Sequence, residues 1–172
     1  MKLENPRNVK DIKALAEIAA QDALFLHELF LNIKSDNERI AYNSSWVLAH
    51  LLEMDKNCEI SRFLSILITT AASTINSGIK RNIFKILQLI NIPKEFQYDC
   101  ADLALNALSN KKNDVAVRAF AITILEHLVL NIPELIEEVL FLIEKEKSFA
   151  TAAFIVRSNR FEKFLTDKNL KH

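Results

Sequence analysis

Glycine and proline are scarce in this chain of 172 residues, which holds one glycine and three prolines. Average usage is about 7% glycine and about 5% proline, and β-rich folds need turn glycines that this sequence lacks. The composition therefore predicts an all-helical protein. It also excludes phosphate-binding loops and nucleophile elbows, because GxGxxG, GxxxxGK[ST] and GxSxG each need at least two glycines where the backbone turns sharply or approaches a ligand.

Cysteine, net charge and long apolar runs are limited as well. Cys58 and Cys100 lie far apart without CxxC spacing, and the first ten residues do not resemble a signal sequence, so we expect reduced thiols and a cytoplasmic protein. The 22 basic and 22 acidic residues give zero formal charge, which removes the long-range attraction that polyanion binders use. The longest charge-free run, residues 63–79, is interrupted by seven Ser, Thr and Asn residues, and we expect no membrane span.

A helical pattern recurs along the chain at a spacing of 38 residues. In residues 114–128, apolar and small side chains stand at i, i+4, i+7, i+8 and i+11, which places them on one face of an α-helix. Subtracting 38 once and twice gives two further sets that also fit one face, and we expect all of these positions to be buried. The sets are Val117, Ala121, Ile124, Leu125, Leu128; Ile79, Ile83, Ile86, Leu87, Ile90; and Ala41, Ser45, Leu48, Ala49, Leu52.

Each of these helices follows another amphipathic helix, so the chain divides into helix pairs. The predicted fold class is all-α, a single domain that forms a right-handed α-solenoid of about four pairs with a capping N-terminal helix near residues 9–20. The second helix of the last pair, roughly residues 148–156, does not fit the 38-residue register, and a polar tail is expected after it. The predicted pairs are residues 21–54, 59–91, 96–130 and 132–157, and the predicted tail is residues 158–172.

Serine side chains are the predicted caps of two second helices. Ser35 and Glu38 have the S-x-x-E form of a capping box, and Ser77 is the expected N-cap of the helix that begins at Ile79.

The sequence V-R-x-x-A-x-x-I-L-x-x-L at residues 117–128 resembles HEAT repeats, and the resemblance covers roughly residues 21–146. Only the third pair has the basic residue and the alanine, Arg118 and Ala121, in their usual places. The chain is also similar to small single-domain bacterial HEAT-like proteins that carry no assigned activity. The resemblance implies a fold and, as its usual consequence, a binding role; it implies no reaction.

The residues that could carry chemistry favour structural roles. His50 and Glu53 share one helical turn and are interpreted as a solvated hydrogen-bonded pair rather than as metal ligands. Cys100 lies in an amphipathic helix, where a free cysteine usually behaves as a small hydrophobe. We therefore expect no enzymatic activity, no metal and no cofactor.

A second set of positions lies roughly opposite the main apolar stripe of the second helices. Trp46, Phe84 and Ile122 occupy it in register, with basic residues beside them, and aromatic and basic residues are typical of interface hot spots. The alternative is that these side chains fill gaps between neighbouring helices. Trp46 is predicted to be partly exposed. The candidate partner-binding residues are Arg39, Tyr42, Asn43, Trp46, His50, Lys80, Arg81, Phe84 and Arg118.

The second helices of HEAT-like solenoids characteristically line the concave side. The predicted function is therefore a non-enzymatic protein–protein interaction or scaffold module that binds a peptide or protein partner on its concave face, with a monomer favoured and the oligomeric state open. The alternative is a nucleic-acid-binding protein related to the HEAT-like DNA glycosylases that act on alkylated bases. Such enzymes need a strongly basic channel, and residues 78–118 carry seven basic and four acidic residues, a net charge of only +3.

Overall fold

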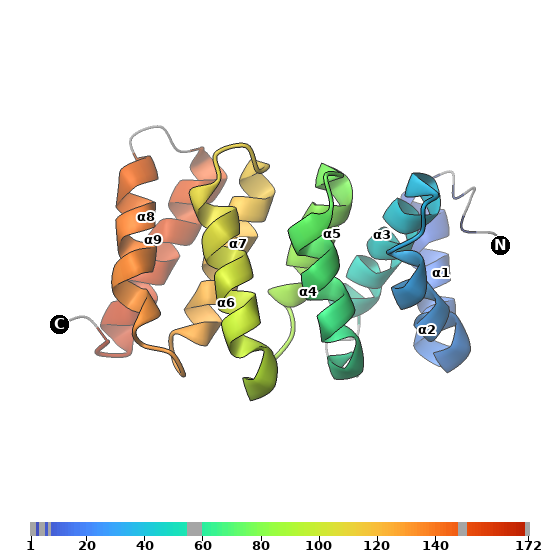
Figure 1. The fold of residues 1–172 in the computed structure, drawn as a ribbon, viewed down its shortest axis with the longest axis horizontal. Helices are drawn as coiled ribbons and strands as arrows, with labels where there is room; N and C mark the ends of the chain where they lie inside the picture. Colours follow the sequence, from blue (N-terminus) through green and yellow to red (C-terminus); the bar gives the residue numbers. More distant parts are fainter. Residues whose placement is uncertain (1–2, 4–5, 7, 55–59, 148–150, 171–172) are drawn as a thin grey trace. The chain divides into compact units, whose positions relative to one another are not determined.

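The computed structural model describes the whole chain except residues 1–2, 4–5, 7, 55–59, 148–150 and 171–172. The described residues form nine α-helices and one short 3-10 helix, and they contain no strand (Figure 1). This confirms the predicted all-α class. The chain falls into two compact units, residues 1–93 and 94–172, which are described separately. That both units make a single domain stays a prediction.

Unit 1 (residues 1–93) consists of two layers of helices. In one layer, α3 packs between α1 and α5; in the other, α2 contacts α4, and these two helices pack against α3 and α5 respectively (Figure 1). The first helix contacts both α2 and α3, as expected of a helix that caps the first pair. The helices are α1 (Val9–Gln21), α2 (Ala23–Asn32), α3 (Glu38–Met54), the 3-10 helix η1 (Ser61–Phe63), α4 (Leu64–Ser73) and α5 (Ser77–Leu87).

Unit 2 (residues 94–172) holds two further helix pairs. Its central helix is α7, which packs against α6 on one side and α9 on the other, while α8 contacts all three. The helices are α6 (Lys94–Ser109), α7 (Val115–Leu128), α8 (Leu135–Lys147) and α9 (Ala152–Asp167).

The fifteen positions of the repeat pattern are all buried, as predicted. Burying a leucine or isoleucine side chain stabilises a fold by roughly 1.5–3 kcal/mol, so these faces hold the helix pairs together. Ser45 is the one polar member of the set. Its hydroxyl donates to the Tyr42 carbonyl at 2.7 Å and accepts from the buried Asn82 amide on α5 at 3.0 Å. The polar position is therefore satisfied within the packing of α3 on α5.

Asparagines, and not the predicted serines, cap two of the second helices. The side-chain oxygen of Asn37 accepts from the backbone N–H groups two and three residues further on, at 3.1 and 3.3 Å, so the Ser35–Glu38 capping box is wrong. Asn76 caps α5 by accepting from the N–H three residues on at 3.1 Å, and Ser77 is already the first helical residue. In both cases an asparagine lies immediately before the helix, where its short amide side chain reaches the free N–H groups.

The C-terminal prediction is wrong as well. Residues 158–167 do not belong to a polar tail, because α9 continues to Asp167 and buries four side chains along one face. The four buried residues stand 37 positions after their counterparts in α7, and not 38. A connection that is shorter by one residue therefore shifts them out of the 38-residue register. The buried residues are Phe154, Ser158, Phe161 and Leu165, the counterparts of Val117, Ala121, Ile124 and Leu128.

Candidate functional site

Between Ala41 and Leu52, only one line of α3 remains accessible, because the other side chains of this part of the helix are buried. The accessible residues recur at three- and four-residue steps, which aligns them along one line of the helix surface. On α5, the accessible charged residues are all basic. We name these residues together the α3–α5 strip: Arg39, Tyr42, Trp46, His50 and Glu53 of α3, with Lys80, Arg81 and Lys85 of α5.

Three rings form a row in the middle of the strip. The ring centroids of Tyr42 and Trp46 are 5.8 Å apart, and those of Trp46 and His50 are 6.2 Å apart. Both distances lie in the range in which aromatic side chains attract each other. Trp46 is half-buried, which confirms its predicted partial exposure. The row therefore presents a pre-arranged aromatic surface to solvent.

The chain's only glycine, Gly78, makes room for the first ring of this row, that of Tyr42. A Cβ atom at Gly78 on α5 would lie 2.6 Å from Cε2 of Tyr42 and 3.0 Å from its Cδ2. The tyrosine ring therefore lies directly against the first turn of α5, at a distance that only glycine permits without a shift of the ring.

The other end of the strip carries a small charge network. Glu53 accepts from the Lys85 ammonium at 2.8 Å, and its second oxygen lies 3.2 Å from Nδ1 of His50. Burial lowers the pKa of His50; Glu53 opposes this effect, while Lys85 and Lys13 of α1 add to it. The imidazole is therefore neutral at neutral pH, and the pair predicted from the sequence is present with Lys85 as a third member. Lys85 was not predicted from the sequence, because its ion pair with Glu53 joins two helices and side-chain spacing within one helix gives no signal for it.

The remaining basic residues of the strip are not neutralised. Arg39 and Arg81 are exposed and Lys80 is half-buried, and none of them forms an ion pair with a carboxylate in the described part of the chain. The strip thus carries three cations that have no carboxylate partner among the described residues.

Two predicted site residues belong to the core of unit 1. Phe84 has no exposed surface, so it fills the helix packing and cannot contact a partner. Asn43 is 5% exposed and donates from its amide to the Leu3 carbonyl at 2.7 Å. Three apolar residues were predicted opposite the main apolar stripe of the second helices. Of these, Trp46 is accessible, whereas Phe84 and Ile122 are fully buried.

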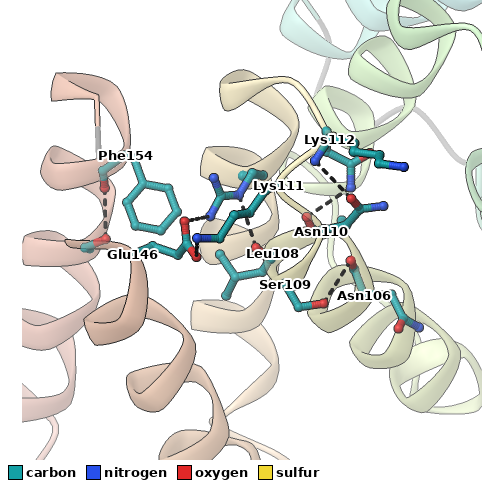
Figure 2. Close-up of polar contacts among 12 residues, drawn as sticks. Asn106, Leu108, Ser109, Asn110, Lys111, Lys112, Glu146 and Phe154 are labelled. Atoms are coloured by element: carbon teal, nitrogen blue, oxygen red, sulfur yellow. Dashed lines mark hydrogen bonds and ion pairs between the residues drawn. The ribbon is translucent and has the colours of Figure 1, made fainter. Parts of the chain in front are cut away.

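Arg118, the predicted site residue of unit 2, is engaged in a polar network of its own (Figure 2). Its guanidinium lies 3.0 Å from one oxygen of Glu146 and donates from Nε to the Leu108 carbonyl at 3.1 Å. Lys111 binds the other oxygen of Glu146 at 3.1 Å. Burial would raise the pKa of the Glu146 carboxyl, but hydrogen bonds and charge from Lys111 and Arg118 bring it below its ordinary value. The network fastens the loop after α6 to α7 and α8.

Three side chains of α9, those of Phe154, Arg157 and Arg160, contact polar or charged side chains of α7. The Arg118 guanidinium lies 5.0 Å from the centre of the Phe154 ring, within cation–π range. Arg160 of α9 binds the buried Glu126 carboxylate at 2.7 Å, and Arg157 donates to Thr123. Glu126 and Thr123 on this face of α7 therefore have their polar partners on α9.

The part of the chain that the structure describes holds neither a cluster of metal ligands nor a thiol of lowered pKa. Among the described residues, no group of three or more His, Cys, Asp and Glu side chains is placed to hold a metal ion. Burial, with a contribution from Asp99, raises the pKa of the Cys100 thiol to about 12, so this residue is the small hydrophobe predicted from the sequence.

A protein-family model described as a HEAT repeat domain matches residues 1–163. The chain belongs to the HEAT repeat family. This confirms the resemblance carried by residues 117–128 and, because HEAT repeats stack into α-solenoids, the predicted fold class. No curated protein and no solved structure matches the chain.

HEAT repeats generally serve as protein-interaction scaffolds and are typically non-enzymatic. In this HEAT protein, none of the described helices is long and apolar enough to span a bilayer. The α3–α5 strip combines three half-buried rings with the cations of Arg39, Lys80 and Arg81.

Proposed function

We propose that this HEAT protein is a non-enzymatic interaction module that binds a peptide or a protein edge along the α3–α5 strip. The observation that carries the proposal is the row of Tyr42, Trp46 and His50 along an accessible line of α3. A half-buried tryptophan on the same strip as two exposed arginines has the composition of an interface hot spot. The aromatic surface is held by packing, so little conformational freedom is lost on binding.

The position of the strip within the repeats supports the same proposal. Both α3 and α5 are second helices of their pairs, and second helices line the concave side in HEAT solenoids. We therefore propose the concave side as the binding side. A cytoplasmic setting is part of the proposal and is supported by the free, buried thiol of Cys100.

Selection from a random peptide library on the intact protein tests this function. Affinities of the selected peptides are then measured for the wild type, Trp46→Ala and Arg81→Glu, with Lys34→Glu as a charge-matched control in an exposed turn of the same unit. We expect the two strip variants to weaken binding by more than about tenfold, the usual effect of removing a hot-spot side chain, and the control to bind like the wild type.

Two results would overturn the proposal. The first is a set of selected peptides that bind Trp46→Ala and Arg81→Glu as tightly as the wild type. The second is a library that yields no peptide with measurable affinity. Because Arg81 is exposed, its variant keeps the test valid even if Trp46→Ala destabilises unit 1.

A further inference from the structure

The unpaired charges of the α3–α5 strip have one sign. The charged residues of α5 are Lys80, Arg81 and Lys85, with no acidic residue in the helix. On α3, the carboxylate of Glu53 is already shared by Lys85 and His50. The strip therefore offers cations and rings but no free carboxylate to a partner.

Unit 2 provides an internal comparison for a cation at this place in the repeat. Arg118 stands 38 residues after Lys80 and occupies the corresponding position on α7. There the cation is bound by the carboxylate of Glu146 and by the ring of Phe154, both supplied by helices that pack on α7 (Figure 2). In unit 2, the basic residue at this repeat position therefore binds a carboxylate and a phenyl ring.

In the described part of unit 1, Lys80 and the two neighbouring arginines of the strip have no such carboxylate partner. Arg39, Lys80 and Arg81 form no ion pair in the described part of the chain, although they lie on the same strip as the aromatic row. A carboxylate-bearing segment would neutralise these charges, and an aromatic side chain on it would pack against Trp46 and Tyr42.

We infer that the segment bound by the α3–α5 strip is an acidic peptide with an aromatic anchor. This inference rests on the proposed function and names the class of partner. The carboxylates of the peptide pair with Arg39, Lys80 and Arg81, and its ring lies against the Tyr42–Trp46–His50 row. Exposed ion pairs strengthen binding by at most about fivefold each, so the charges set selectivity while the ring supplies most of the affinity.

The test uses Trp46, the only tryptophan of the chain, as its probe. The intact protein is titrated with four ligands: a short synthetic peptide with one phenylalanine flanked by aspartates and glutamates, the same peptide with lysines in place of the acidic residues, the acidic peptide with alanine in place of phenylalanine, and oligothymidylate. We expect the acidic phenylalanine peptide to bind at least about tenfold more tightly than the other two peptides. We expect its advantage over the lysine peptide to shrink as salt screens the charges.

Charge reversal gives the matching variant experiment. In Lys80→Glu/Arg81→Glu the preference is expected to turn towards the lysine peptide, because like charges then face the acidic one. The control reverses two exposed lysines of unit 2, Lys112 and Lys168, and is expected to keep the wild-type preference.

The outcomes separate this inference from the proposed function. If library peptides bind the strip but are neutral or basic, and the lysine peptide binds as tightly as the acidic one, the acidic partner is refuted while strip binding stands. If no peptide binds, both fail. If oligothymidylate binds more tightly than the acidic peptide, the partner is a nucleic acid and the inference is overturned.

Discussion

Gly78→Ala offers a sharp test of the contact that holds the aromatic row in place. In a helix, alanine is favoured over glycine by up to about 1 kcal/mol, so the substitution alone would stabilise α5. The new Cβ would lie 2.6 Å from the Tyr42 ring, which is closer than carbon atoms approach, so the ring has to move. Moving it costs about 0.5–1.5 kcal/mol in side-chain strain and about 0.5–1.5 kcal/mol in lost packing against Trp46.

These opposing effects predict a change of sign between two backgrounds. In the wild type, Gly78→Ala should destabilise unit 1 by between about 0 and 2 kcal/mol. In Tyr42→Ala, the ring is absent and the same substitution should stabilise the unit by up to about 1 kcal/mol. The coupling energy of the double-mutant cycle is therefore about 1–3 kcal/mol.

Urea unfolding followed by tryptophan fluorescence measures this coupling, because the chain's only tryptophan, Trp46, lies in unit 1 and reports on that unit. Ser77→Ala is the control, since it changes helix propensity at the exposed residue before Gly78. The same effect of Gly78→Ala in both backgrounds would refute the packing of Tyr42 on α5.

Three further predictions concern other residues. Cys100, with its pKa raised to about 12, should react with a thiol reagent in the Cys58→Ser variant only when urea unfolds unit 2; rapid reaction in the native protein would contradict its burial. Arg118→Ala should destabilise the protein by about 1–3 kcal/mol in a urea melt, because it removes the buried cation that pairs with the Glu146 carboxylate. Lys111→Ala removes an exposed cation from the same carboxylate and should change stability by less than about 1 kcal/mol. Equal effects of the two substitutions would count against the network. Burial lowers the pKa of His50 in the folded state below 6.5, so the unfolded chain takes up the proton first as the pH falls. The contribution of His50 to stability should therefore be full above pH 6.5 and decrease below it. His50→Asn should flatten this pH dependence in melts at several pH values, and an unchanged slope would contradict the assignment to His50.

The regular part of the fold could be predicted from the sequence because burial follows helical periodicity. The fifteen repeat positions are buried, and the accessible side of α3 is the one that the periodicity left over. The end of the chain could not be placed in this way. In α9 the pattern shifts by one residue, and charged residues surround the few apolar ones, so composition suggested a tail where periodicity at a new register makes a helix.

The candidate site was predictable only in part, for a physical reason. Periodicity gives the direction of a side chain from its own helix, but exposure depends on what the neighbouring helices place there. Trp46 and Phe84 share a repeat position, yet one is half-buried and the other fully buried. The sequence pattern of Arg118 is that of a binding residue, but Glu146 of α8 and Phe154 of α9 contact its guanidinium. The repeat register does not predict these contacts, because it ends before α9.

The hydrogen bond between Ser45 and Asn82 also bears on how similar helices find their correct neighbours during folding. A chain built from near-equivalent apolar faces could pair α5 with the wrong helix at little loss of hydrophobic contact. Asn82 is 6% exposed, and in such a misfolded pairing its amide would be buried without the acceptor that Ser45 supplies, a loss of about 1–3 kcal/mol. This single polar contact therefore discriminates against non-native association of α5, which apolar residues of similar size could not do.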